Sequence, residues 1–264
     1  NNPSTPMSNI RFLAIPNSDK LSTSYYSDLV AVGTKMLHFM PEKNTKEFVP
    51  PSSCVFNEAA AELCTLVGKS MFKYDVCKGA FTSVVNDVHT ADVTAIVLDG
   101  PRGRRAFVGC GNGDLLLINY MSGSVIDSVS AHKKEVNCVL SLQGSRNTVF
   151  SGAADGSIVV SEEHKGDLRV HTSIENAFGE GVGVTDIKVA SSINILVATS
   201  SGTQWGLWHA HTCKRVALFN ESMHGGPVSK VEIIGASRDE ASMAYVKSLC
   251  VCVCVCVCVC CVRM

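Results

Sequence analysis

The chain has 264 residues, enough for one large domain or two small ones, and 46% of them are hydrophobic, which is sufficient for a substantial core. Its 23 basic and 24 acidic residues leave a formal net charge of -1, so no global charge excess draws it to nucleic acid or to an acidic membrane. Aromatic residues make up 6% of the chain, which is few for a base-stacking surface. We therefore expect other proteins as partners, and no nucleic-acid, membrane or small-molecule partner.

The chain begins with a polar segment that contains Pro3, Pro6 and Pro16. Its composition predicts a disordered lead-in over residues 1–20, or the cut end of a longer chain. It lacks the charged, apolar and small-residue regions of a signal peptide. Outside the last sixteen residues the cysteines occur singly, at Cys54, Cys64, Cys77, Cys110, Cys138 and Cys213. Isolated cysteines indicate free thiols in a reducing compartment, and we expect a cytoplasmic protein.

Internal repeats dominate the middle of the chain. Four segments, 93–99, 136–142, 184–190 and 228–234, open with valine and alternate apolar with polar residues. This alternation predicts half-buried strands. Their first residues are 43, 48 and 44 positions apart, a spacing that predicts a repeated structural unit.

Each repeat continues with more strands. Tight turns at Asn112-Gly113, Asp155-Gly156 and Ser201-Gly202 join a predicted second strand to a third, and an outer strand follows. Residues 63–84 show the same order without a clear opening strand, and residues 28–43 match the middle of a unit. No segment has a convincing helical period. We predict an all-β fold of four-stranded antiparallel units.

Four short strands in about 43 residues are typical of propeller blades, and the pattern resembles the WD-repeat β-propeller family. In that family a Trp-Asp pair ends the third strand and a Thr-Gly turn follows two residues later. The corresponding pairs are Tyr74-Asp75 before Lys78-Gly79, Ile118-Asn119 before Ser122-Gly123, and Trp208-His209 before Thr212-Cys213.

The resemblance also implies buried hydrogen bonds within each blade. A histidine four residues before the opening valine would bond to a hydroxyl on the second strand and, through it, to the turn aspartate and the tryptophan. The implied positions are His89, His132, Ser151, Asp155, His224, Asp75 and Trp208. The set is most complete around His132, Ser151 and Asp155, although Ser161 stands at the tryptophan position of that blade.

The tryptophan positions count the blades: Phe39, Tyr74, Ile118, Ser161 and Trp208. We therefore predict a β-propeller over residues 21–248, with about five recognisable blades and an incomplete one that begins at Val228. A propeller closes its ring so that no sheet edge stays open. This number of blades is therefore expected for a fragment of a longer propeller protein, such as a large ciliary one, or for an imperfect gene model.

Within residues 249–264, cysteine and valine alternate from residue 250 to residue 260. Same-face cysteines on one strand are about 6.6–6.8 Å apart, whereas sulfurs on a tetrahedral zinc lie about 3.8 Å apart. The DNA repeat GT, read in triplets, encodes Val-Cys without end, so we interpret the segment as a translated microsatellite. A thiol-rich metal or redox tail is the alternative. In either case this uncharged, β-branched segment is expected to pair with the open edge of the last blade.

The motifs that suggest catalysis or metal binding have structural explanations. His209, His211 and Cys213 would share one face of a strand, but Cys213 occupies the turn-glycine position, which predicts a bend and no metal site. The glycines of 178–184 and 109–113 precede strands, whereas dinucleotide and phosphate loops precede helices. We predict no catalytic residue, no metal and no cofactor. A propeller enzyme is a weaker alternative, because only Asp186 interrupts the apolar inner strands.

The fold would present a ring of loops without chemistry of its own, so we predict a non-catalytic scaffold within a multiprotein complex. The candidate partner-binding residues are Asp87, Asp92, Asn112, Lys133, Lys134 and Glu135. The alternative is a propeller that binds phosphoinositides at a membrane surface through Arg102, Arg104 and Arg105. The resemblance places such scaffolds in the cytoplasm, including cytoskeletal and ciliary assemblies.

Overall fold

The computed structural model of the chain describes residues 51–144, 146–191, 193–220, 228–234, 243–248 and 252–255. Within these residues the secondary structure is entirely β, as the alternating segments predict. Four antiparallel four-stranded sheets follow one another along the chain, and the described residues add a fifth sheet of three strands.

The strands of each sheet are consecutive in the sequence and pair in sequence order. The first sheet contains β1 (Ser53–Asn57), β2 (Glu62–Val67), β3 (Ser70–Asp75) and β4 (Ala80–Val85). The second contains β5 (Val93–Leu98), β6 (Arg105–Cys110), β7 (Asp114–Asn119) and β8 (Val125–Ser130). The third contains β9 (Val136–Leu142), β10 (Asn147–Ala153), β11 (Ile158–His164) and β12 (Asp167–Ile174). The fourth contains β13 (Val184–Ala190), β14 (Ile195–Ser200), β15 (Gln204–His209) and β16 (Arg215–Asn220).

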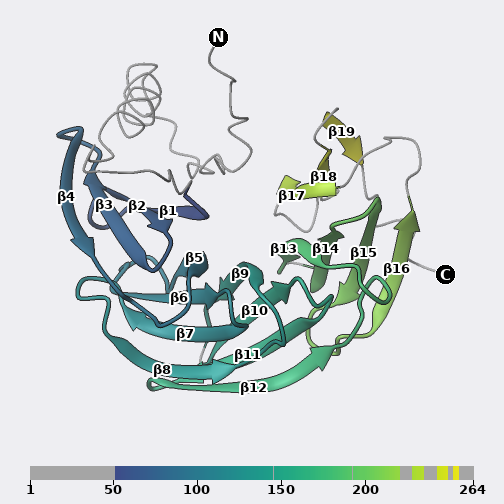
Figure 1. Cartoon of the computed structure of the whole chain (residues 1–264). Helices are drawn as coiled ribbons and strands as arrows, with labels where there is room; N and C mark the ends of the chain where they lie inside the picture. The colour runs from purple at the N-terminus through teal and green to yellow at the C-terminus, as the bar shows by residue number, and fades with distance from the viewer. Residues whose placement is uncertain are drawn as a thin grey trace, which may run out of the picture.

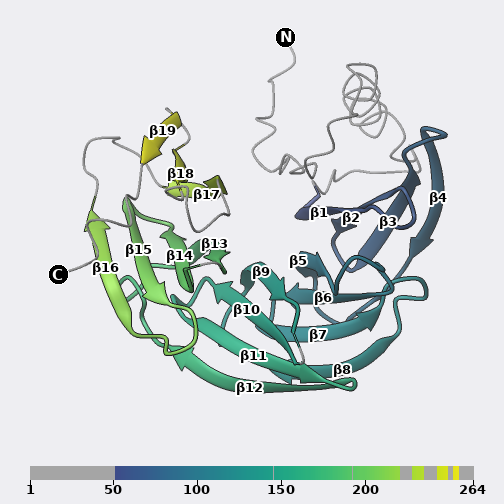
Figure 2. The same cartoon turned by 180° about the vertical axis from the view of Figure 1, so that it is seen from behind.

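The sheets stand side by side in a propeller-like arc (Figure 1 and Figure 2). The opening strands β1, β5, β9 and β13 lie on the inside of the arc, and β4, β8, β12 and β16 form its outer rim. The described sheets do not close into a ring. This arrangement agrees with the repeat that the sequence predicts.

The fifth sheet contains β17 (Val228–Ile234), β18 (Met243–Ser248) and β19 (Cys252–Val255). Strand β19 comes from the Val-Cys segment and pairs antiparallel with β18. The expected edge pairing of that segment is therefore confirmed. Whether a microsatellite encodes it stays a prediction.

One expectation about the first sheet is wrong, and two predicted segments fall outside the described residues. The first sheet has an opening strand, β1, although its sequence SCVFN lacks the valine-led pattern of the later openings. Segment 28–43, with Phe39, lies outside the described residues, as does the lead-in 1–20.

Apolar side chains fill each junction between neighbouring sheets. Leu116 and Ile118 of β7 face the first sheet, whereas Leu115 and Leu117 face the third. At the next junction Trp208 meets Phe178 edge to face, with ring centroids 5.4 Å apart. Full burial of one such side chain contributes roughly 1.5–3 kcal/mol to folding. Successive residues of a strand point to opposite faces of the sheet, so one strand contributes apolar side chains to the cores on both sides.

Candidate functional site

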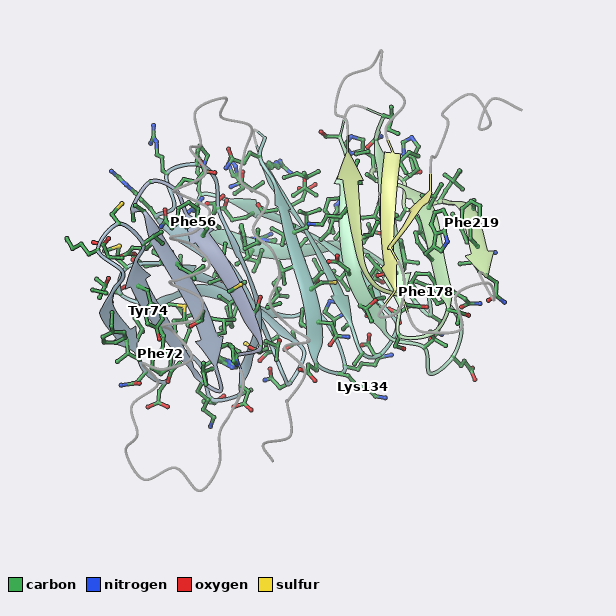
Figure 3. The ribbon with its side chains drawn as sticks, turned by 90° about the horizontal axis from the view of Figure 1, so that it is seen from above. Phe56, Phe72, Tyr74, Lys134, Phe178 and Phe219 are labelled. Atoms are coloured by element: carbon green, nitrogen blue, oxygen red, sulfur yellow. The ribbon has the colours of Figure 1, made fainter. Side chains whose placement is uncertain are left out.

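The antiparallel units place their connecting loops on two opposite faces of the arc. We call one the histidine face; its loops are 68–69, 86–92, 111–113, 131–135, 154–157, 175–183 and 201–203. We call the other the arginine face; its described loop residues are 58–61, 76–79, 99–104, 120–124, 143–144, 146, 165–166, 191, 193–194 and 210–214. Figure 3 looks along the sheets and shows Lys134 at the rim that belongs to the histidine face.

Backbone hydrogen bonds fasten the histidine-face loops to the neighbouring hairpin turns. The His132 amide donates to Gly113 O at 3.0 Å, and the Ala177 amide donates to Gly156 O at 2.9 Å. Gly113 has φ +93°, and a Cβ there would lie 2.2 Å from the His132 carbonyl oxygen. Only glycine permits so close an approach with this backbone conformation.

A second series of backbone bonds acts within each sheet. The amides of Gly111, Ala154 and Ser201 donate to the carbonyl oxygens of Asp92, Glu135 and Gly183, each at 2.8 Å. The loop that enters a sheet is thereby tied to the end of that sheet's second strand. Both series of bonds recur from sheet to sheet. Each entering loop is therefore hydrogen-bonded to the hairpin turn of the preceding sheet and to the second strand of its own sheet.

His132 anchors the third sheet at this face. Its side chain is fully buried, with Nδ1 2.6 Å from Ser157 Oγ and Nε2 2.7 Å from Ser151 Oγ. Ser157 Oγ also donates to Asp155 Oδ1 at 2.6 Å. Because that hydroxyl proton is committed to the carboxylate, we assign Nδ1–H as the donor to Ser157 and Nε2 as the acceptor from Ser151.

Burial lowers the pKa of His132 to about 4, against the opposing field of Asp155. The imidazole is therefore neutral near pH 7, as the hydrogen-bond assignment requires. Burial alone raises the pKa of Asp155, but hydrogen bonds from Ser157 and from the Lys133 amide lower it overall. The structure thus brings His132, Ser151 and Asp155 together and adds Ser157, which the repeat pattern does not single out.

The other predicted blade positions make different contacts. His89 has an 18% exposed side chain with Nε2 3.7 Å from Asp114 Oδ2. Asp75 caps its own turn, since its carboxylate accepts from the Lys78 amide at 2.9 Å and pairs with Lys78 Nζ. Trp208 is buried and packs against Phe178. His224 lies outside the described residues.

The six candidate partner-binding residues all lie in exposed loops of the histidine face. They are Asp87, Asp92, Asn112, Lys133, Lys134 and Glu135. Lys133 to Glu135 follow directly on the buried His132, so the buried network positions them. Asn112 is held by Asp114, whose amide donates to Asn112 Oδ1 at 3.2 Å. These side chains share a face, but no short contact joins the 86–92 loop to the 131–135 loop among the described hydrogen bonds.

Inner-strand residues that the repeat pattern leaves unassigned join one sheet to the next. Thr94 Oγ1 donates to Val136 O at 2.6 Å, and Asn137 Nδ2 donates to Val184 O at 2.7 Å. Asp186, the acid that interrupts the inner strands, accepts from the Val231 amide at 3.1 Å. Asp186 thus fastens the fifth sheet. The polar residue directly after the opening valine is the sequence signal for the bonds of Thr94 and Asn137, whereas Asp186 stands two residues after its opening valine.

On the arginine face, Arg105 begins β6 and bridges two sheets. It makes a paired contact with Glu163 at 2.9 and 3.2 Å and also contacts Asp99. Asn147 donates to both carboxylates at 2.8 Å. Burial raises the pKa of Glu163, but hydrogen bonds from Gly166, Arg105 and Asn147 lower it overall. Arg105 is therefore held in ion pairs between two sheets, and its predicted role in lipid binding stays a prediction.

A cleft of about 250 Å³ opens beside this ion pair, between the second and third sheets. Its lining includes Arg105, Asn147 and Glu163, with His164 and Lys165 exposed at the rim. Arg102 and Arg104, the other two residues of the candidate lipid-binding set, are exposed in the adjoining 99–104 loop.

The described residues form neither a metal-binding cluster nor a membrane-spanning helix. Cys213 has φ +55°, so the bend expected after His209 is present, and no cluster of three metal-ligating side chains occurs in the described part of the chain. Cys64, Cys77, Cys110 and Cys213 form no disulfide with a described residue. The described ranges also hold no helix with the length and hydropathy that crossing a bilayer requires.

No protein-family model matches the sequence, and no curated protein is significantly similar to it.

Proposed function

We propose that the chain is a WD-repeat-like β-propeller that acts as a non-catalytic scaffold and binds other proteins through the loops of the histidine face. The observation that carries this proposal is the repeated fastening of those loops. Each entering loop bonds to a hairpin turn through its backbone, while its charged side chains stay exposed.

Fastened loops favour protein binding for a thermodynamic reason. A loop that is ordered before binding loses little conformational entropy when a partner arrives. The buried His132 network holds the root of the 131–135 loop, and Lys133, Lys134 and Glu135 project from it. Exposed charges on an ordered loop set which partner is accepted more than how tightly it binds.

The cytoplasm is the compartment we infer, and a cytoskeletal or ciliary complex is consistent with the resemblance. Support comes from Cys64, Cys77, Cys110 and Cys213, which form no disulfide with a described residue. Structural disulfides are rare in the reducing cytosol, and unpaired cysteines are common there.

The test compares proteins captured from cells by the full chain and by two variants. Lys133→Glu with Lys134→Glu reverses charge on the histidine-face loop. The control, Thr82→Glu with Ser128→Glu, also places two glutamates on the surface, at exposed positions of the outer strands β4 and β8, with half the change in net charge. We expect the loop variant to lose specific partners that the wild-type chain and the control both retain. An identical set of captured proteins for all three chains would contradict the proposal.

A further inference from the structure

Charge is divided unequally between the two loop faces, although the whole chain is almost neutral. The described loops of the arginine face carry six basic residues and two acidic ones, of which Asp99 is buried. The basic residues are Lys78, Arg102, Arg104, Arg146, Lys165 and Lys214, and the exposed acid is Glu58. Lys78 and Arg146 are paired with the strand residues Asp75 and Glu162. The described loops of the histidine face carry three basic and six acidic residues: Lys69, Lys133 and Lys134 against Asp87, Asp92, Glu135, Asp155, Glu175 and Glu180.

The three arginines of the 99–105 segment have two different roles. Arg105 anchors the segment, because Glu163 and Asp99 hold its guanidinium between the sheets. Arg102 and Arg104 are exposed and form no ion pair with a described residue. The anchored arginine therefore leaves two guanidinium groups available for another molecule.

The loop that carries these two arginines is fixed on both sides. Asn57 Nδ2 of the first sheet donates to Gly103 O at 3.0 Å, and the Tyr120 amide donates to Arg104 O at 2.9 Å. The Gly103 amide closes the turn by donating to Gly100 O at 3.1 Å. Arg102 and Arg104 thus project from a backbone that is already in place.

An exposed apolar side chain lies beside them. Met121 is 63% exposed, the highest value among the large hydrophobic side chains described. It directly follows Tyr120, which bonds to Arg104. The buried Lys73 fixes this turn, since its Nζ donates to the carbonyl oxygens of Tyr120 and Met121. On the other side of the second sheet the cleft begins at Arg105 and ends at the exposed Lys165.

We propose that the arginine face binds an acidic, extended protein segment. Its carboxylates pair with Arg102 and Arg104, an apolar residue packs on Met121, and the segment continues past the cleft to a further carboxylate at Lys165. Guanidinium groups suit this partner because their planar donors match a carboxylate with two hydrogen bonds. The inference rests on the proposed protein-binding function and adds the chemical class of one partner.

Two other anionic partners fit the described surface less well. Single-stranded nucleic acid needs aromatic side chains on which bases stack, but the exposed Phe81 and Phe219 belong to the outer strands β4 and β16. A flat anionic bilayer would contact the rim charges only, whereas a side chain of a peptide can enter the cleft between Arg105 and Lys165.

The test measures binding of the purified full chain to a fluorescein-labelled peptide that contains six glutamates and two leucines. A peptide with glutamine in place of each glutamate is the matched ligand control. We expect the dissociation constant of the glutamate peptide to rise about tenfold or more in Arg102→Glu with Arg104→Glu, and by a smaller factor in Lys165→Glu. Lys69→Glu, the same charge change as Lys165→Glu but on the histidine face, should leave it within about twofold.

Three results would overturn the inference. One is equal affinity of the wild-type chain and the arginine variant for the glutamate peptide. Another is the absence of any preference for the glutamate peptide over the glutamine peptide. The third is binding to phosphatidylserine vesicles, dependent on Arg102 and Arg104, without binding to the peptide. All substituted side chains are exposed, and an unchanged thermal unfolding transition verifies that each variant is folded. A negative result here leaves the histidine-face capture experiment unaffected, so the two proposals fail separately.

Discussion

His132 and His89 occupy the same place in consecutive repeats, yet their surroundings differ. His132 is fully buried between the hydroxyls of Ser151 and Ser157. His89 is 18% exposed and has only a carboxylate oxygen 3.7 Å from Nε2. Its Nδ1 accepts from the amide of Ala91 in its own loop, at 3.3 Å.

The second-strand and turn residues explain the difference. Val108 stands in the second sheet where Ser151 stands in the third, and Asp114 stands where Ser157 does. Without those two hydroxyls the imidazole has no buried partners, and a buried polar group without partners is costly. The histidine alone therefore does not make the network; two serines complete it.

The largest expected effect is the loss of stability on removing His132. His132→Ala leaves two buried hydroxyls with fewer partners and creates a cavity, so we expect the free energy of unfolding to fall by about 2–4 kcal/mol. His89→Ala should cost about 1 kcal/mol or less, because its side chain is already partly solvated. Denaturant unfolding of both variants measures the difference, and equal losses would show that the two sites are equivalent.

The second-largest expected effect is a fall in the free energy of unfolding at acid pH, caused by the protonation of His132. The pKa of His132 is about 4 in the folded protein, against 6.5 for the ordinary side chain. Between these pH values the unfolded chain binds the proton and the folded one does not. The stabilisation is thus complete above about pH 6.5 and is lost as the pH falls toward 4, by about 2 kcal/mol between pH 7 and pH 5.

Unfolding curves at several pH values, for the wild-type chain and for His132→Gln, test this pH dependence. Carboxylates titrate in both chains, so the difference between the two isolates the imidazole. The same slope in both chains between pH 7 and pH 5 would mean that His132 is not the group responsible.

Ser157 should matter more than its counterpart in the second sheet. Ser157→Ala interrupts the path from His132 to Asp155, and we expect a loss of about 1–2 kcal/mol. Asp114→Ala removes exposed hydrogen bonds to Asn112 and Ser130, for which we expect about 0.5 kcal/mol or less. Matched thermal unfolding of the two variants provides the comparison. A larger loss for Asp114→Ala would reverse the ranking of the two sites.

The smallest effect is a gain in stability within the same third sheet. Ser161 stands at the tryptophan position, is fully buried, and its hydroxyl has no hydrogen-bond partner in the described structure. Ser161→Ala removes this unsatisfied group, so we expect a gain of about 0.5–1 kcal/mol. Ser128→Ala, at an exposed position of β8, is the control and should change little. A destabilised Ser161→Ala would indicate that the hydroxyl has a partner after all.

The repeat made the fold predictable from the sequence. Valine-led segments mark β5, β9, β13 and β17, because alternation shows which strands bury one face. The positive φ of Cys213 also follows from its place in the repeat, where Gly166 stands one sheet earlier and Gly123 two sheets earlier. Local pattern and repeat position were sufficient for these features.

Contacts between distant residues were not predictable in this way. The bond between Arg105 and Glu163 joins residues 58 positions apart and depends on how two sheets face each other. Strand β1 lacks the opening valine that marks the later units, so its pairing with β2 decides its structure. The role of Ser157 becomes visible only when its hydroxyl is placed between His132 and Asp155.

The central claim is that the sheets hold the histidine-face loops in one arrangement before a partner arrives. Amide hydrogen exchange of the full chain tests it at Gly111, His132, Ala154 and Ala177, whose N–H groups make the fastening bonds. We predict exchange at least about 100-fold slower than in an unstructured peptide at all four amides. Exchange at the unstructured rate would contradict the claim, because the loops would then be ordered only by what binds them.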